Sequence, residues 1–285
     1  MIDKTIITRT LKDITGRELY NINQVVCNFN SSEQELYKTI LDEFYTMSAE
    51  YHIHTGNSRK DSMFRILAQL NTLLKACSIP HSFKEYNGNK LSSKFLKVFE
   101  LLDQFKNERV AVGCTRIKTV ELYATEIRRQ FPDRKLFIIT GNETTLKERR
   151  EIVKELKKYD NAILLSTQQA LSCSMNIGFV DKVIIPEMQY NDSSMGQYRG
   201  RFIRMNSDNK TQVYNVIYNK SIENNLLKLI MCKEKLNLFM KNQDLNDDEI
   251  FEKYGVDSWL FNCLMVKEKN DDGSINITWG EQNII

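Results

Sequence analysis

The stretch "KLFIITGNETTLKERREIVKELKKYDNAILLST", residues 135–167, decides the fold. It begins and ends with short apolar runs, "KLFIIT" (135–140) and "AILLST" (162–167), and the segment between them has the composition of a helix. Apolar runs that alternate with helices of ten or more residues are typical of a parallel sheet whose two faces are covered. This stretch therefore predicts a strand, a crossover helix and a second strand of one sheet.

The same alternation continues on both sides of this stretch. The further apolar runs are "RVAVGC" (109–114), "KVIIPE" (182–187) and "TQVYNVIY" (211–218), with helix-like segments after the first run and from Ser221 onward. We therefore expect an α/β fold with a doubly wound, mainly parallel sheet flanked by helices. In such a sheet, ligands bind at the loops that follow the carboxyl ends of the strands.

The chain divides into three zones by composition. Residues 1–108 are expected to be mostly helical, residues 109–242 hold the α/β lobe, and residues 243–285 form a small α+β tail. In the first zone we expect a short strand at 23–29 and helices at 31–51, 61–77 and 92–105. Ser31 or Ser32 is expected to cap the first of these helices, and Gln34 or Glu35 to complete a capping box. The tail is expected to contain a β-hairpin that turns at Asp272–Gly273.

The composition is that of an ordinary globular protein, with 41% hydrophobic and 27% charged residues. Forty basic against 37 acidic residues give a net charge of +3, which by itself does not indicate nucleic-acid binding. The six cysteines include no CxxC pair, so reduced thiols are favoured over disulfides. No apolar run is long enough for a signal peptide or a membrane span. We therefore expect a soluble, intracellular protein without a membrane partner.

The three histidines are poor candidates for a metal site. His52 and His54 alternate in "YHIHTGN", and His81 follows a proline. None of them is accompanied by a cluster of cysteines or carboxylates, which a structural or catalytic metal ion would need. No metal site is therefore expected.

The segment "MGQYRGRFIRMNSDNK", residues 195–210, combines weak helix formers with crowded positive charge. On a helix, Gln197, Arg201 and Arg204 are spaced i, i+4, i+7 and share one face. Guanidinium groups bind phosphate through paired hydrogen bonds, and Gly200 lets that face approach a ligand closely. The pattern thus indicates an anionic ligand, although an exposed basic helix face explains it equally well.

Small polar residues stand where three of the expected strands end. They are Cys114–Thr115, Thr140–Gly141 and Ser166–Thr167–Gln168. Backbone amides at helix N-termini and small hydroxyls are good phosphate ligands, so three such turns at one edge could follow a nucleic-acid backbone. For any single turn, ordinary helix capping is the simpler explanation.

Several segments resemble the motifs of one helicase superfamily. "QYRGRFIR" (197–204) resembles the sixth motif of superfamily-two helicases, Q-x-x-G-R-x-x-R, and Ser221–Ile222–Glu223 resembles the threonine-isoleucine-glutamate helix start of the Swi/Snf family. The segments similar to the fourth motif, the fifth motif and the Asp-Gly-Ser region are "RVAVGCTRIKTVELYATEI", "LLSTQQALSCSMN" and "IITGNETTLKERR". The resemblance extends upstream through "TRTLKD", "FNSSEQELYKTI" and "LNTLLKACSIP", so that in order it covers about residues 8–240. The chain is identified as a member of the Swi/Snf-type DNA translocases, as the C-terminal, second RecA-like lobe.

Three positions depart from the family pattern. Gly113 stands where the family has an aromatic residue, Thr140 precedes Gly141 where an aspartate is usual, and the fifth motif lacks its glycines. These departures are compatible with a divergent member, such as one from a virus or phage. They put in question how tightly the fifth-motif loop would hold DNA.

The resemblance implies a role for each matching residue. Arg204 would be the arginine finger, Arg201 would reach the triphosphate, and Gln197 would help to position the attacking water or the γ-phosphate. Gly200 and Asn176 would lie at the nucleotide. The residues that would contact the nucleic-acid backbone are Cys114, Thr115, Thr140, Gly141, Arg149, Ser166, Thr167 and Gln168.

The resemblance also implies ATP and Mg²⁺, bound mainly by a first lobe that carries the Walker A and acidic motifs. Neither motif occurs in this chain, so the first lobe, fused or separate, is the expected partner, together with double-stranded DNA. ATP hydrolysis by this lobe alone is expected to be undetectable. The alternatives are a stand-alone binding module without ATPase activity, and a strand-separating helicase that acts on RNA.

Overall fold

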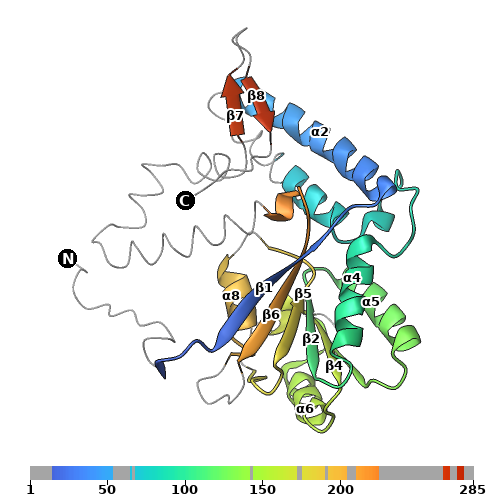
Figure 1. Cartoon of the computed structure of the whole chain (residues 1–285), viewed down its shortest axis with the longest axis vertical. Coiled ribbons are helices and arrows are strands. Elements are labelled where there is room, and N and C mark those ends of the chain that lie inside the picture. Colours follow the sequence, from blue (N-terminus) through green and yellow to red (C-terminus); the bar gives the residue numbers. More distant parts are fainter. Residues whose placement is uncertain are drawn as a thin grey trace, which may run out of the picture. The chain divides into compact units, whose positions relative to one another are not determined.

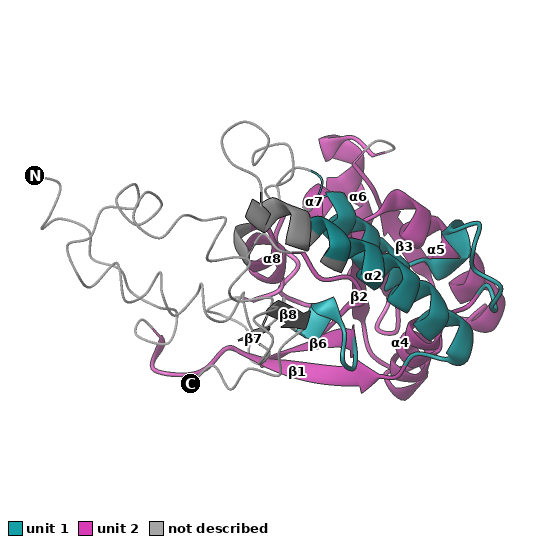
Figure 2. Ribbon diagram, turned by 90° about the horizontal axis from the view of Figure 1, so that it is seen from above, with its two compact units in different colours: residues 1–8, 29–90, 218–285 teal, residues 9–28, 91–217 magenta. Residues whose placement is uncertain are grey.

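The computed structural model describes residues 15–53, 65, 68–141, 144–171, 175–189, 192–203, 210–224, 266–269 and 275–278. It divides into two compact units. The first unit comprises residues 1–8, 29–90 and 218–285, and the second comprises residues 9–28 and 91–217 (Figure 2). Each unit is described by itself.

The second unit is built on one six-stranded sheet (Figure 1). Its strands, in chain order, are β1 (Tyr20–Cys27), β2 (Val110–Cys114), β3 (Leu136–Ile139), β4 (Ile163–Thr167), β5 (Lys182–Ile185) and β6 (Thr211–Tyr218). They lie side by side in the order β1-β6-β5-β2-β4-β3, and the pairs from β6 to β3 are parallel. The expected doubly wound parallel sheet is thus confirmed.

The outermost strand, β1, also runs parallel to its neighbour. Near its start, the Leu19 carbonyl accepts a hydrogen bond of 3.0 Å from the Thr211 amide. At its end, the Cys27 thiol donates to the Ile217 carbonyl over 3.4 Å. The sequence predicted this strand at residues 23–29, whereas it begins at Tyr20 and ends at Cys27. The part of the chain expected to be mostly helical therefore supplies an edge strand of the sheet.

Helices flank the sheet on both sides. They are α4 (Ser93–Gln104), α5 (Ile117–Gln130), α6 (Leu146–Leu156), the short α7 (Gln168–Leu171) and α8 (Asp192–Arg199). Figures 1 and 2 show α4 and α5 on one side of the sheet and α8 on the other. The rings of Phe95 in α4 and Tyr123 in α5 stack at 3.8 Å between centroids, which joins these two helices. No helix in the described residues is both long and apolar enough to cross a membrane.

Local side chains start two of these helices. The Ser92 hydroxyl accepts a hydrogen bond from the Phe95 amide and caps α4. Thr145 caps α6 in a reciprocal capping box with Glu148, whose carboxylate accepts bonds from the Thr145 amide and hydroxyl. These bonds favour the ionised carboxylate, so the pKa of Glu148 is lowered. Both caps satisfy amides that an α-helix leaves unpaired at its first turn.

Arg134 ties together the end of the sheet opposite the carboxyl ends of the strands. Its guanidinium donates to the carbonyls of Asn161 (2.8 Å), Leu102 (2.6 Å) and Glu108 (2.9 Å). Burial lowers the pKa of this group to about 10, because a low-dielectric surrounding disfavours the charged form. The loops that lead into β2 and β4 are thereby fixed to the end of α4.

The first unit contains α2 (Ser31–Ile53), a helical stretch at residues 68–76 and a short 3₁₀ turn at Pro80–Ser82. Asn30 rather than a serine caps α2, since its side-chain oxygen accepts from the Glu33 amide at 2.9 Å. The Glu33 carboxylate accepts from the Asn30 amide at 3.0 Å. The expected cap at Ser31 or Ser32 is therefore wrong by one or two residues. The expected capping box is present at the start of α2, between Asn30 and Glu33.

Ser221–Ile222–Glu223 starts a helix in the way its resemblance implies. The Glu223 carboxylate accepts from the Tyr218 amide at 3.0 Å, and the Ser221 hydroxyl accepts from the Glu223 amide at 3.2 Å. The Ile222 amide donates to the Tyr37 hydroxyl at 2.8 Å. The rest of the long helix expected after Ser221 lies outside the described residues.

The tail contains the expected hairpin. Strands β7 (Val266–Lys269) and β8 (Ile275–Thr278) pair antiparallel, with Lys269 opposite Ile275. The turn predicted at Asp272–Gly273 lies outside the described residues. The division of the chain after residues 108 and 242 stays a prediction.

Candidate functional site

The register of the sheet brings the predicted phosphate-binding turns to one edge. Gly113 lies opposite Ser166 and Cys114 opposite Thr167, while Ile139 at the end of β3 lies opposite Ser166. The carboxyl ends of β2, β4 and β3 are therefore neighbours in space. The turns after them open on the same side of the sheet, where α/β proteins bind ligands.

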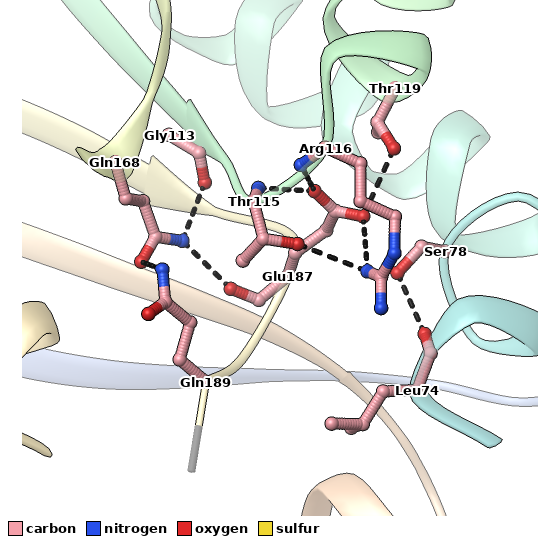
Figure 3. A network of polar contacts seen from close by, with 9 residues as sticks. All are labelled: Leu74, Ser78, Gly113, Thr115, Arg116, Thr119, Gln168, Glu187 and Gln189. Carbon is pink, nitrogen blue, oxygen red and sulfur yellow. Dashed lines mark hydrogen bonds and ion pairs between the residues drawn. The ribbon is translucent and has the colours of Figure 1, made fainter. Parts of the chain in front are cut away.

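The turn after β2 is filled by a carboxylate from elsewhere in the chain (Figure 3). Glu187, which follows β5, accepts hydrogen bonds from the amides of Thr115 and Arg116 at the start of α5. Its other oxygen accepts from the Thr119 hydroxyl and from the Arg116 guanidinium, both at 3.0 Å. Glu187 is 1% exposed. It thus links the end of β5 to the N-terminus of α5 through a buried ion pair.

Gln168 joins three strand ends with one side chain. Its amide nitrogen donates to the Gly113 carbonyl at 3.0 Å and to the Glu187 carbonyl at 2.8 Å. Its amide oxygen accepts from the Gln189 side chain at 3.0 Å (Figure 3). Because Gln168 itself starts α7 after β4, it holds the ends of β2, β4 and β5 at a fixed spacing.

Arg149 fixes the turn after β3. Its guanidinium donates to the carbonyls of Thr144 (3.0 Å), Ala170 (2.9 Å), Thr140 (3.3 Å) and Gly141 (3.3 Å). These bonds tie the turn after β3 to the end of α7. Arg149 is buried, so its side chain shapes the turn from inside.

The residues predicted to contact nucleic acid differ in exposure. Gly141 is exposed and Thr115 is half-buried. The other six are buried: Cys114, Thr140, Arg149, Ser166, Thr167 and Gln168. Burial and the nearby Glu187 carboxylate raise the pKa of the Cys114 thiol, which therefore stays protonated at neutral pH. A direct contact between these residues and nucleic acid stays a prediction.

The arginine segment forms a shorter helix than the sequence predicts. α8 ends at Arg199, and the chain continues in two tight turns in which the Arg201 amide donates to the Tyr198 carbonyl at 3.1 Å. Such i to i−3 bonds tighten the last turn of a helix, and here they follow Gly200. Gln197 is exposed on α8 and Arg201 is half-buried in the turn. Arg204 lies outside the described residues, so the shared face of all three is untested.

Asn176 lies in a loop beside the arginine turn. The amide of the next residue, Ile177, donates to the Arg201 carbonyl at 3.0 Å. Asn176 is exposed, and its side-chain oxygen accepts from the Gly178 amide at 3.1 Å. Asn176 is therefore the chain neighbour of a residue that is hydrogen-bonded to Arg201. A role of Asn176 or Gly200 at a nucleotide stays a prediction.

Tyr198 is a residue that sequence reasoning missed. Its ring is fully buried and lies over Gly113, where an added Cβ would meet the Tyr198 hydroxyl at 2.4 Å. Burial raises the pKa of the phenol, and the nearby Ser166 hydroxyl acts in the opposite direction. α8 therefore fills the space that Gly113 leaves open. An aromatic side chain from the helix takes the place of the aromatic residue that the resemblance expects on the strand.

Glu187 was also missed, because no local pattern marks it. It ends the apolar run "KVIIPE", where a carboxylate is unremarkable, and its partners lie about 70 residues earlier in the chain. The lack of any capping residue before α5 was the available signal, since Arg116 makes no side-chain cap. Among the described residues, no group of three or more His, Cys, Asp or Glu side chains could hold a metal ion.

Residues 93–206 match the family model of the helicase conserved C-terminal domain. Among curated proteins, the chain is similar to a DNA repair and recombination protein RAD54-like from Drosophila erecta, with 19% identity over 301 residues. The match covers 95% of this chain and 37% of that relative. The chain thus spans little more than a third of the relative's length.

Solved structures share the fold. The C-terminal domain of a Sulfolobus solfataricus SWI2/SNF2 ATPase matches with a TM-score of 0.58 and 17% identity, over 81% of this chain and 96% of that one. The core of a Sulfolobus solfataricus SWI2/SNF2 ATPase in complex with double-stranded DNA matches with a TM-score of 0.60 and 18% identity, over 81% of this chain and 49% of that one. The RecA-like fold and the resemblance stated from the sequence motifs are thereby confirmed.

Proposed function

We propose that this chain, the C-terminal lobe of a superfamily-two helicase of the Swi2/Snf2 type, serves as the second motor lobe of an ATP-dependent DNA translocase. The observation that carries the proposal is the segment from Gln197 to Arg201. It puts an exposed glutamine on α8 and a half-buried arginine in the turn after Gly200. Tyr198, the residue after Gln197, lies over Gly113 of β2, at the sheet edge where three strand ends meet.

Gln197, Arg201 and Arg204 are the residues of this chain that would contact ATP. Two guanidinium groups and an amide suit the charge and the hydrogen-bonding geometry of a triphosphate. Gly200 has no Cβ, so the backbone of this turn can come close to a ligand. Arg204 is the proposed arginine finger, which stabilises charge on the phosphoryl group as it is transferred. Mg²⁺ would be held mainly by the first lobe.

The nucleic-acid contact is proposed for the carboxyl edge of the sheet. Gly141 is exposed there, and Thr115 is half-buried. Arg149 and Gln168 would act from inside by holding the turns on which these residues stand. Double-stranded DNA is the proposed substrate because a SWI2/SNF2 ATPase core of the same fold has been solved in complex with it.

The decisive experiment combines this chain with its first lobe, fused or added as a separate protein, and measures DNA-stimulated ATP hydrolysis. Arg204→Ala and Arg201→Ala should each lower turnover, and for Arg204→Ala we expect a loss of roughly 10³-fold or more. Arg128→Ala, which removes an exposed arginine at the end of α5, is the matched control and should leave turnover unchanged.

Near wild-type turnover of Arg204→Ala would contradict the arginine-finger role. A second result would contradict the motor function as a whole. If the chain binds duplex DNA with a steep salt dependence but adds nothing to hydrolysis by the first lobe, it is a binding module. Tighter binding of RNA than of duplex DNA would instead favour a strand-separating helicase.

A further inference from the structure

We infer that Glu187 is an internal anion that occupies the N-terminus of α5 and excludes phosphate from it. The sequence predicted the turn at Cys114–Thr115 as one of three that bind the nucleic-acid backbone. The contacts of Glu187 remove the backbone amides of this turn from that role. The selectivity of this edge for phosphate therefore depends on a residue 72 positions away from Thr115 in the chain.

The position that Glu187 occupies is one in which a phosphate would otherwise bind. The first amides of a helix have no partner within the helix, and the helix dipole attracts negative charge to them. Here the amides of Thr115 and Arg116 both donate to one carboxylate oxygen of Glu187. The Thr119 hydroxyl and the Arg116 guanidinium donate to the other oxygen, at 3.0 Å each. Two amides, a hydroxyl and a guanidinium make a set of donors typical of a phosphate site.

The amides that Glu187 binds lie at the N-cap position of the helix and one residue before it. Arg116 occupies the N-cap position of α5, and its side chain makes no capping bond. In α6, by contrast, Thr145 and Glu148 supply the cap from within the helix. The N-terminus of α5 would thus present unpaired amides if the Glu187 carboxylate were removed.

Glu187 is also held so that a ligand cannot easily displace it. Its side chain is 1% exposed. Its backbone carbonyl accepts from Gln168 at 2.8 Å, and Gln168 is bound in turn to the Gly113 carbonyl. A phosphate that took the place of this carboxylate would have to separate it from the Arg116 guanidinium, and a buried carboxylate left without its partner is strongly unfavourable.

For nucleic acid, the consequence rests on the proposed function. With the α5 amides bound to Glu187, the backbone of a DNA strand can use the exposed turn at Gly141 and the side chain of Thr115, but not the amides of residues 115 and 116. The exclusion of phosphate from α5 does not itself depend on DNA binding. It is therefore tested with inorganic phosphate.

The test compares Glu187→Ala with Glu126→Ala in the whole chain. Both changes remove the carboxylate of a buried residue that pairs with an arginine, but Glu126 pairs with Arg129 away from the start of α5. We expect both variants to melt at a lower Tm than the wild type. At 100 mM, inorganic phosphate should raise the Tm of Glu187→Ala by about 3 °C more than that of the wild type or of Glu126→Ala, since it binds the vacated donors. Sodium chloride of equal ionic strength is the reference.

Equal effects of phosphate on all three proteins would overturn the inference. If Glu187→Ala does not fold, an NMR titration of the wild-type protein tests the inference instead. Its Thr115 and Arg116 amide resonances should not move during a titration with phosphate, and a saturable shift of both would show that phosphate reaches them. Failure of the chain to bind duplex DNA would contradict the proposed function and leave both of these results unaffected.

Discussion

The Tyr198 ring lies over Gly113 because that residue has no side chain. The phenol is fully buried, and among the described residues neither its hydroxyl nor that of Ser166 has a partner that meets hydrogen-bonding geometry. Close packing against Gly113 thus helps to position α8 on β2. The turn with Arg201 follows α8 directly, so this contact also helps to position the arginine.

Gly113→Ala should therefore destabilise the protein. The new methyl group would lie 2.4–2.6 Å from three atoms of the fully buried Tyr198 side chain, and overpacking of this kind costs about 1–3 kcal/mol. Urea unfolding measures the loss. Gly141→Ala is the control, because a Cβ there would meet nothing within 4 Å. Equal stability of the two variants would mean that Tyr198 does not need the space.

At the scale of helices, local and distant caps differ in how far the sequence predicts them. Asn30, Ser92 and Thr145 each cap a helix within three residues of their partners. Such pairs leave a visible spacing, which is why a capping box was correctly expected for α2 even though its register was wrong. Asn30 is followed by two serines, and all three residues are of types that favour the N-cap position. The sequence alone therefore does not show which of them caps the helix. At α5 the N-cap residue Arg116 makes no side-chain cap. The carboxylate that binds the Thr115 and Arg116 amides comes from Glu187, which is so distant in the chain that no spacing marks it.

The register of the α2 cap can be tested by substitution. Asn30→Ala should lower the free energy of unfolding by about 1 kcal/mol, because it removes the acceptor for the Glu33 amide. Ser31→Ala, one residue later and exposed, should change it by less than about 0.5 kcal/mol. Thermal or urea unfolding of the two variants compares them. A larger loss of stability in Ser31→Ala than in Asn30→Ala would show that Ser31 caps α2, as the sequence predicted.

At the scale of the whole molecule, the sequence predicts the sheet better than it predicts the site. Five buried apolar runs became strands β2 to β6, because a strand covered on both faces must be apolar along its length. Strand β1 was harder to place, since "YNINQVVC" alternates polar and apolar residues and one of its edges is open. The turns after β2, β3 and β4 were correctly expected at one edge, and the roles of the residues on them stay predictions. Their burial could not be foreseen, because it depends on contacts such as those of Arg149 and Gln168 that cross between elements.

The contribution of β1 can be measured by deletion. Removal of residues 1–28 should cost roughly 3–6 kcal/mol of stability, because it takes away the buried side chains of Leu19 and Cys27 and leaves β6 as an unpaired edge. Ile22→Lys is the control, since Ile22 is 40% exposed and its substitution keeps the strand. Calorimetry of both variants gives the comparison. An unchanged Tm after the deletion would mean that the sheet is stable with five strands.

The pairing of β1 with β6 also has a consequence for how the protein is made. Cys27 and Ile217 are bonded across 190 residues of chain. At roughly 5–20 residues per second, a ribosome needs about 10–40 s to make the partner of a strand that has already left it. During this wait, Asn23 and Gln24 separate Ile22 from Val25 and Val26, so the nascent strand shows no long apolar run. The polar residues that made β1 hard to predict are the ones that protect it from pairing with other nascent chains before β6 is synthesised.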